Sequence, residues 1–295
     1  MFIYIEHRFI NNDYITLSLV CQYLTIKKKM VYFFATEIKR GDCMDAPDSK
    51  VKSLYKALSL LDYFDMAHPD RSITELASET GMLKSTVYNI LSTFAALGYI
   101  TQDETTHRYR LGYKFLEISY LIRKTNSFQR QMRPFLEKAA HQTGESVTYA
   151  IRSGIETIYL DTAYPPMATV VRLNIGARYP LYSTAGGKAI LANSEPAIFE
   201  RVCSAGLTAF TQHTLTSRQQ LAEEMELIHQ QGYAVDNMEN EYGIRGFAVP
   251  IWDSNNMLMG AISLSGPSPR ISDQRIREFF PIFQAIQTDA RSLSA

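Results

Sequence analysis

Ser72 to Gly98 reads SITELASETGMLKSTVYNILSTFAALG and predicts two short helices joined by a tight turn. Ser72 and Glu75 have the spacing of a capping box, in which the two side chains each bind a backbone N–H group at the start of a helix. Gly81 stands where such a helix ends in the left-handed conformation, which glycine adopts without steric cost. The second helix would end at Gly98 and bury apolar residues at helical spacing, namely Val87, Ile90, Leu91, Phe94 and Leu97.

The other side of the second predicted helix carries polar residues near its start. Each of them can hydrogen-bond a phosphate or a base edge, and none is needed for a core: Lys84, Ser85, Thr86, Tyr88 and Asn89. A helix–turn–helix inserts this part of its second helix into the major groove of DNA. An ordinary helical hairpin within an α domain has the same turn spacing, so the motif alone leaves both interpretations open.

A β-hairpin is expected next, because residues 99–102 and 108–111 both alternate and a polar turn joins them. Side chains alternate along a strand, so Arg108 and Arg110 fall on the same face. Two arginines alone are common on a solvated face. After a helix–turn–helix, they predict a winged helix whose wing grips the DNA backbone.

Several further segments resemble one family. KSTVYNILSTFAALGYI, the hairpin ending in YRLG, and the later segments YPLYSTAGGKAILA, GYAVDNMENEYGIRGFAVPIW and AISLSGP resemble the IclR family of bacterial transcription regulators. The resemblance covers residues 50 to 295 in order. It implies an α+β chain, with an N-terminal winged helix–turn–helix followed by a GAF-like mixed α/β effector-binding domain. It also implies dimers or tetramers on operator DNA.

The domain organisation follows from these patterns. We expect a non-conforming N-terminal extension, a winged helix–turn–helix, a linker helix and an effector-binding domain, at residues 1–47, 48–111, 112–125 and 126–295. Within the extension, residues 15–26 are apolar but too few to span a bilayer. The extension lacks a clear signal peptide, and an upstream-start artefact with Met44 as the true start is expected over a membrane-surface anchor. We therefore expect no membrane partner.

Helical and strand patterns complete the outline. A helix is expected over residues 48–66, with a stripe packed on the helix–turn–helix that consists of Val51, Leu54, Leu58, Leu61 and Phe64. The linker helix has apolar residues on two sides, which suits a dimer contact. Beyond it, hairpin and helix patterns alternate, with a strand at residues 169–173 among them. This order predicts an antiparallel sheet flanked by helices.

Composition limits the classes of function. The 295 residues carry no net charge, and 46% are hydrophobic, which suits two packed domains. Residues 50–133 carry 12 basic and 8 acidic side chains, and residues 134–295 carry 12 and 16, so the basic excess accompanies the winged helix. Three scattered cysteines fit a reducing cytoplasm and neither a disulfide framework nor a zinc site. The chain has no nucleophile elbow, H-E-x-x-H motif or dinucleotide fingerprint, so we expect no enzyme, cofactor or metal.

A candidate ligand site lies at residues 183–188, STAGGK, directly before a predicted helix. Small residues at a helix start let backbone N–H groups approach an anion, which the helix dipole favours. A P-loop is a poor match, because the first glycine is missing and Ala189 replaces the Ser or Thr that would hold magnesium. A carboxylate is the better guest, although a tight turn for close packing has the same pattern.

The resemblance adds roles for individual residues of this effector site. It implies backbone donors at Ala185 and Gly186, a hydrogen bond from the effector to Asp236, hydroxyls from Ser263 and Ser265, and Ile244 as an apolar lid. Alternatively, Asp236 is a surface turn residue and either serine lies on a solvated strand face. Gly246 replaces a cysteine of some family members, which would enlarge the pocket for a bulkier effector. Four tyrosines could frame it, of which at least two are expected to be ordinary half-buried residues: Tyr149, Tyr159, Tyr179 and Tyr182.

Asn89 is a second departure, since family members often carry arginine there. Asparagine can pair with adenine through two hydrogen bonds, so we expect a different base at that contact. The favoured function is a transcriptional regulator, most simply a repressor, that binds a palindromic operator as a homodimer or homotetramer. A small organic or sugar acid would control it. The alternatives are an enzyme built on the C-terminal domain and a ligand-free architectural DNA-binding protein that uses this domain only to dimerise.

Overall fold

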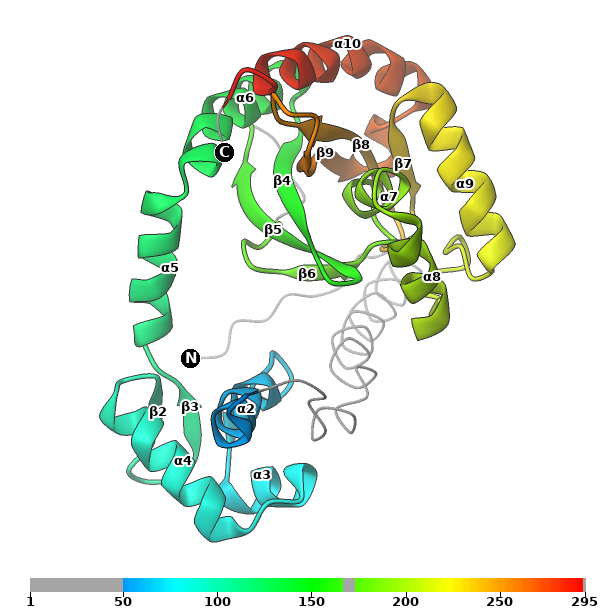
Figure 1. Ribbon diagram of the computed structural model, residues 1–295. Coiled ribbons are helices and arrows are strands. Elements are labelled where there is room, and N and C mark those ends of the chain that lie inside the picture. Colours follow the sequence, from blue (N-terminus) through cyan, green and yellow to red (C-terminus); the bar gives the residue numbers. More distant parts are fainter. Residues whose placement is uncertain (1–49, 167–172, 294–295) are drawn as a thin grey trace, which may run out of the picture. The chain divides into compact units, whose positions relative to one another are not determined.

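The chain forms two compact units that meet between Leu121 and Ile122, within one helix (Figure 1). The computed structural model describes residues 50–166 and 173–293. The extension expected at residues 1–47 lies outside the described residues. Among the described helices, none combines the length and the apolar character needed to cross a bilayer.

The N-terminal unit is a winged helix–turn–helix. Its elements in chain order are α2 (Lys52–Ser59), η2 (Leu60–Tyr63), β1 (Asp70–Arg71), α3 (Ile73–Thr80), α4 (Lys84–Ala96), β2 (Ile100–Gln102), β3 (Tyr109–Leu111) and the start of α5 (Lys114–Thr125). The three strands form an antiparallel sheet in the order β1-β3-β2. The predicted fold class of this unit is therefore confirmed.

The predicted capping box is present at the start of α3. Ser72 Oγ accepts a hydrogen bond from the Glu75 N–H at 3.2 Å, and Glu75 Oε2 accepts one from the Ser72 N–H at 2.8 Å. Gly81 ends the helix at φ 70°, in the left-handed region. The helices enclose a core that consists of Leu60, Tyr63, Phe64, Leu76, Ala77, Val87, Leu91, Ile100 and Tyr109.

Three predictions for this unit are wrong in detail. The first α-helix ends at Ser59 and continues as one 3₁₀ turn, η2, rather than reaching residue 66. Leu60 in this turn is fully buried, whereas Leu54 and Leu58 in the preceding α-helix are half exposed. Leu97 is also exposed rather than buried. Strand β1 was not expected, because two residues are too few to show alternation.

The C-terminal unit is a six-stranded antiparallel sheet covered by helices on both faces. Its elements are α6 (Ser127–Thr143), β4 (Ser146–Ser153), β5 (Glu156–Ala163), β6 (Arg178–Pro180), α7 (Ala185–Ala192), α8 (Pro196–Ala205), α9 (Arg218–Gln231), β7 (Ala234–Asn237), β8 (Ile244–Trp252), β9 (Leu258–Pro267), η3 (Ser268–Arg270) and α10 (Asp273–Ala290). The strand order is β6-β5-β4-β9-β8-β7. Helices α6 and α10 pack on one face, and α7 packs on the other with α8 and α9 beside it (Figure 1).

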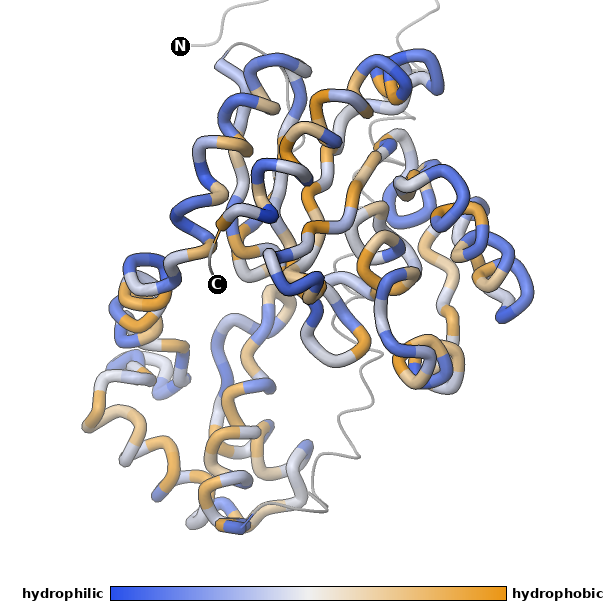
Figure 2. Tube along the Cα trace, turned by 45° about the horizontal axis from the view of Figure 1, so that its top comes forward, coloured by the Kyte–Doolittle hydropathy of each residue, from blue (hydrophilic) through white to orange (hydrophobic). Residues whose placement is uncertain are grey.

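The two faces of this sheet differ in side-chain size. Large side chains face α6 and α10, among them Phe247 and Leu264. The face toward α7 carries small residues, because Gly246 pairs with Ser265 and Ala248 pairs with Ser263. Figure 2 shows that hydrophobic and hydrophilic positions alternate along the helices that cover the sheet. The small face lets α7 approach the sheet closely.

Two details of the C-terminal unit differ from expectation. Most of the strand predicted at residues 169–173 lies outside the described residues, and Leu173 is not in a strand. The edge strand is instead β6, which pairs with β5. Helix α7 begins at Ala185, inside the STAGGK segment that was expected to precede it. Thr184 caps the helix there by accepting a hydrogen bond from the Gly187 N–H at 3.0 Å.

The two capping boxes test whether the units unfold independently. Ser72→Ala should destabilise the N-terminal unit by about 1 kcal/mol, because one N–H group at the start of α3 loses its acceptor. Ser217→Ala should do the same to the C-terminal unit, where Ser217 and Gln220 cap α9. Trp252 is the single tryptophan and lies in the C-terminal unit, so its fluorescence reports that unit alone in urea denaturation. Ser217→Ala should shift the fluorescence transition. Ser72→Ala should shift the far-UV circular dichroism transition and leave the fluorescence transition unchanged. Equal shifts of the two transitions in Ser72→Ala would contradict independent units.

Candidate nucleic-acid interface and ligand pocket

The polar start of α4 projects away from the core of the N-terminal unit. Val87 and Leu91 are fully buried and anchor the helix. The five predicted DNA-binding residues on the other side are all exposed: Lys84, Ser85, Thr86, Tyr88 and Asn89. The helix is preceded by Leu83, whose side chain makes no cap, so the first backbone N–H groups have no side-chain acceptor from the N-cap residue. Such N–H groups suit a phosphate oxygen.

The tip of the wing is a turn between β2 and β3 that Asp103 organises. Its carboxylate accepts hydrogen bonds from the backbone N–H groups of Thr105 and Thr106 at 3.1 and 2.8 Å. Hydrogen bonds from Thr106 hold the pKa of Asp103 below its ordinary value. Arg110 extends beside this turn with 55% of its side chain exposed, and its nearest carboxylate oxygen, on Asp103, is 3.5 Å away. Arg110 is therefore largely exposed on the wing, and its ion pair with Asp103 is long.

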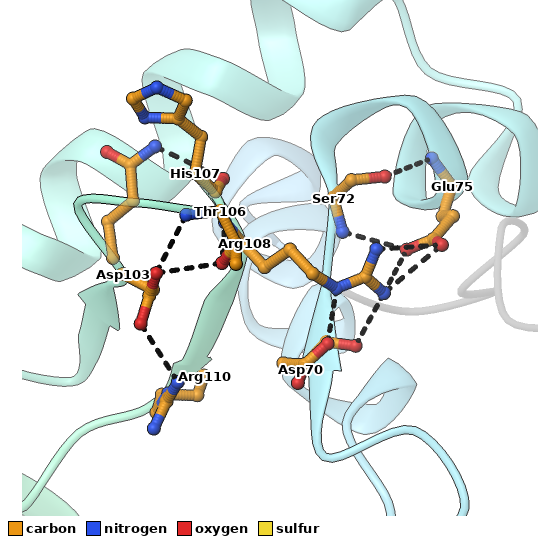
Figure 3. Close-up of polar contacts among 9 residues, drawn as sticks. Asp70, Ser72, Glu75, Asp103, Thr106, His107, Arg108 and Arg110 are labelled. Carbon is orange, nitrogen blue, oxygen red and sulfur yellow. Dashed lines mark hydrogen bonds and ion pairs between the residues drawn. The ribbon is translucent and has the colours of Figure 1, made fainter.

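Arg108 is placed differently from Arg110 (Figure 3). Its guanidinium donates to both Glu75 oxygens, at 2.9 Å to Oε2, and also to the Asp70 carboxylate. The sequence analysis predicts both wing arginines as DNA-backbone contacts; in the structure Arg108 is engaged by two carboxylates of the same unit. Its acidic partners come from β1, which was not predicted, and from the capping box of α3, to which the sequence assigned only a local role.

A cavity of about 60 Å³ lies in the C-terminal unit between the start of α7 and the small face of the sheet. Six of the seven predicted effector residues line it, with six more: Ala185, Gly186, Asp236, Ile244, Ser263 and Ser265, then Tyr159, Leu173, Tyr179, Thr184, Asn240 and Glu241. The seventh, Gly246, lies alongside, because a Cβ there would be 3.4 Å from the Cβ atoms of Ala185 and Asp236. The fold thus brings the predicted residues together from four separate segments.

The start of α7 presents backbone donors at this cavity. Ala185 and Gly186 are the first two helical residues, whose N–H groups have no intrahelical acceptor. A Cβ on Gly187 would lie 2.6 Å from the Leu181 carbonyl oxygen, which explains the second glycine as a close-packing requirement. The first glycine is different, since a Cβ on Gly186 would be 3.6 Å from Ser263, in ordinary contact distance. Close packing therefore accounts for Gly187 and does not account for Gly186.

Asp236 is buried and lines the cavity, so it is not a surface turn residue. Its Oδ1 accepts a hydrogen bond from the Glu239 N–H at 2.7 Å. Burial raises the pKa of Asp236 to about 7, and the nearby charge of Glu239 adds to the rise. Near neutral pH this carboxyl can therefore accept or donate a hydrogen bond.

Beneath the cavity lies a buried ion cluster that the sequence analysis missed. Lys188 Nζ is fully buried and donates to Glu239 at 2.6 Å and to Glu224 at 2.7 Å. Burial alone would lower the pKa of Lys188, but the charges of Glu239 and Glu224 outweigh it and raise the pKa. Glu239 Oε2 is buried and accepts no hydrogen bond from the described residues. A lysine inside the apolar helix AGGKAILA was the available signal, because such a lysine requires buried acidic partners.

The size and lining of the cavity refine two expectations. A cavity near 150 Å³ accommodates benzene, so about 60 Å³ gives no support to a bulky effector. Of the four candidate tyrosines, Tyr159 and Tyr179 line the cavity. Tyr149 and Tyr182 do not, since their hydroxyls donate to the backbone oxygens of Met259 and Thr208. Within residues 50–166 and 173–293, no cluster of His, Cys, Asp or Glu suits a metal ion.

A winged helix–turn–helix joined to an α/β domain with a small polar cavity defines a DNA-binding regulator of the ligand-sensing type. The family model "Bacterial transcriptional regulator IclR C-terminal" matches residues 122–295, and "IclR helix-turn-helix domain" matches residues 53–104. The chain belongs to the IclR family of transcriptional regulators. Since this family consists of regulators and not enzymes, the alternative of an enzyme built on the C-terminal domain is set aside.

Individual relatives agree with this assignment. The HTH-type transcriptional regulator XynR of Escherichia coli (strain K12) is 31% identical over 230 residues, which cover 78% of this chain and 91% of the relative. The Transcriptional repressor IclR of the same strain is 29% identical and covers 78% and 85% of the two chains. An IclR homolog from Microbacterium hydrocarbonoxydans, solved in complex with 4-hydroxybenzoate, superimposes with a TM-score of 0.68 at 19% identity, over 81% of this chain and 99% of that one. That likeness shows the shared fold.

Asp236 makes the stability of the C-terminal unit depend on pH. Its folded-state pKa of about 7 exceeds the ordinary 3.8, so the folded state binds the proton more tightly. The resulting stabilisation is complete below the ordinary pKa and is lost as the pH rises through about 7. Between pH 5 and 8 the wild-type protein should lose on the order of 2 to 3 kcal/mol more unfolding free energy than Asp236→Asn. Urea denaturation followed by Trp252 fluorescence measures this difference, with the exposed Asp289→Asn as control; parallel pH profiles for wild type and Asp236→Asn would contradict the raised pKa.

Proposed function

We propose that this protein is a cytoplasmic repressor that binds a palindromic operator as a homodimer or as a pair of dimers, and that a small carboxylate-containing metabolite controls it. The exposed polar face of α4, anchored by the buried Val87 and Leu91, is the single observation that carries the proposal. The net positive charge of residues 50–133 supports the same conclusion, because phosphate neutralisation supplies most of the affinity for DNA.

Within the DNA interface we assign different roles along α4 and the wing. Lys84, Ser85 and Thr86 would contact phosphates, since they stand at the helix start where N–H groups also point outward. Tyr88 and Asn89 would reach base edges in the major groove, one turn further along. Arg110 would contact the backbone from the wing. Asn89 fits adenine, whereas an arginine there would fit guanine.

A dimer is supported by exposed apolar surface in the N-terminal unit and α5. No residue of α5 is buried, although several of its residues are hydrophobic. Exposed residues on α2, before α5 and along it are Val51, Leu54, Leu58, Tyr113, Leu116, Tyr120, Leu121 and Ile122. A monomer rarely exposes so much apolar surface, and a second copy of the chain would cover it. A two-fold dimer in turn matches a palindromic operator.

The cavity defines the chemistry of the effector. The described residues that line it include no lysine or arginine, so the N–H groups of Ala185 and Gly186 and the dipole of α7 would bind the carboxylate. Asp236, Ser263 and Ser265 would bind hydroxyl groups of the same ligand. The Microbacterium homolog is described with 4-hydroxybenzoate, which carries both a carboxylate and a hydroxyl. The cavity volume favours smaller acids here, such as short hydroxy, keto or sugar acids. Regulation then requires the effector to bind the DNA-competent and DNA-incompetent arrangements unequally.

Two substitutions in α4 separate base contacts from phosphate contacts. Asn89→Ala should cost roughly 1–3 kcal/mol of operator binding and relax the preference at one base pair. Lys84→Ala should weaken binding to all sequences alike and lower the salt slope by about one. Gel shift on the DNA beside the protein's own gene, at several salt concentrations, measures both, with the exposed Thr93→Ala on the same helix as control. Unchanged discrimination by Asn89→Ala would contradict the assignment of Asn89.

A thermal-shift screen of short organic, keto and sugar acids tests the pocket. A ligand that binds only the folded state should stabilise it by about 2.7 kcal/mol at a hundred times its dissociation constant, which raises the melting temperature by several degrees. Ser263→Ala should reduce this shift because the cavity loses a hydroxyl, while Ser204→Ala, exposed on α8, should leave it unchanged. An absence of any shift across the panel would favour a ligand-free DNA-binding protein.

A further inference from the structure

Arg108 connects three separate parts of the winged helix. Its Nη2 donates to the Asp70 carbonyl oxygen at 3.1 Å, and Nε donates to the Asp70 carboxylate. On the other side, Nη1 and Nη2 donate to Glu75 Oε1 at 3.2 and 3.1 Å, and Nη2 reaches Oε2 at 2.9 Å. The guanidinium therefore bridges the segment entering β3 to β1 and to the first turn of α3 (Figure 3).

Glu75 is shared between two tasks. The same Oε2 that accepts from Arg108 also accepts from the Ser72 N–H in the capping box. The hydrogen bond from Ser72 and those from Arg108 lower the pKa of Glu75, and the hydrogen bonds to Asp70 and Glu75 raise the pKa of Arg108. Both groups therefore stay charged across the physiological range. The start of the first helix of the motif and the base of the wing are thus joined by one charge-assisted network.

The charges around Arg108 make it unsuited to bind a phosphate in this arrangement. One guanidinium is balanced against two carboxylates, those of Asp70 and Glu75, so the cluster carries a net negative charge. A DNA phosphate would be repelled unless Arg108 left both partners. Arg110 forms its ion pair with Asp103 at the longer distance of 3.5 Å and is more exposed than Arg108, at 55% against 34% of the side chain.

We propose that Arg108 is a positioning residue that fixes the wing against the capping box of α3, so that Arg110 meets the DNA backbone. The proposal rests on the proposed binding of operator DNA and adds a division of labour between the two wing arginines. Register supports it, because Asp70 pairs with Arg110 and Arg71 pairs with Tyr109 between β1 and β3. Holding β1 and Arg108 together therefore also fixes the strand that carries Arg110.

Glu75→Gln distinguishes this proposal from a phosphate contact, because the two predict effects of opposite sign. Glutamine at this position still completes a capping box, so α3 keeps its cap. If Arg108 positions the wing, Glu75→Gln weakens the network and should lower operator affinity, as Arg108→Gln does. If Arg108 binds phosphate, Glu75→Gln frees the arginine, removes a repulsive charge and should raise affinity.

The experiment measures operator binding by the full chain over a range of salt concentrations, at a temperature where circular dichroism shows every variant folded. Arg108→Gln and Glu75→Gln should each lower affinity by roughly fivefold, and the double variant should be no weaker than either single one. Arg108→Lys should not restore binding, because an ammonium cannot bridge two carboxylates in the same fork geometry. Arg110→Gln should lower the salt slope by about one, and adding Arg108→Gln should lower it no further.

Four results would overturn the proposal. Tighter operator binding by Glu75→Gln would make Arg108 a phosphate contact. So would a double variant, Arg108→Gln with Arg110→Gln, whose salt slope is lower than that of the wild type by about two. Unchanged affinity of folded Arg108→Gln, with only a lower melting temperature, would limit Arg108 to stabilising the fold. A wild-type protein that binds no operator would remove the proposed function as well. The other results would remove only the proposed role of Arg108.

Discussion

The C-terminal unit depends on the contrast in side-chain size between the two faces of its sheet. Gly246, Ala248 and Ser263 leave a shallow surface on which α7 rests, while Phe247 and Leu264 fill the core on the opposite side. Larger residues on the α7 face would lift the helix and separate its first residues from Ser263, which a Cβ on Gly186 would contact at 3.6 Å. The cavity exists because this face is small, and its position at a helix start makes it suitable for an anion.

The small face also requires a second contact to hold α7 in place, and Lys188 provides it. Its buried ammonium joins α7 to Glu224 on α9 and to Glu239 after β7. Glu239 in turn donates its N–H to Asp236, so the cavity floor and the ion cluster form one connected network. Lys188 binds two of the three carboxyls in this network, those of Glu224 and Glu239. Burial raises the pKa of Asp236 to about 7, and the charge of Glu239 adds to the rise. A ligand at Asp236 therefore acts on a group already coupled to two helices.

Features encoded by neighbouring residues could be predicted from the sequence, and features formed by distant residues could not. The capping box, Gly81 and the buried side of α4 follow from spacing within a few positions, and each was expected. Six cavity residues were expected from family motifs, because each motif is local even though the cavity joins several. Strand β1, the partners of Arg108 and those of Lys188 were missed, since each contact joins residues about 30 or more positions apart. The turn to 3₁₀ winding at Leu60 was missed for another reason, because its residues fit an α-helix equally well.

The two capping boxes of the chain show how a local motif acquires a role beyond the helix it starts. In α9, Ser217 is paired with Gln220, a neutral side chain that satisfies the backbone and forms an exposed cap. In α3, Ser72 is paired with Glu75, which satisfies the backbone in the same way but adds a negative charge. Both side chains cap a helix, so capping alone does not account for the choice of glutamate in α3. The charge draws Arg108 from a segment 33 residues away and joins the wing to the helix pair. The orientation of the wing is thus linked to Glu75, which the sequence pattern identifies only as part of the cap of a helix.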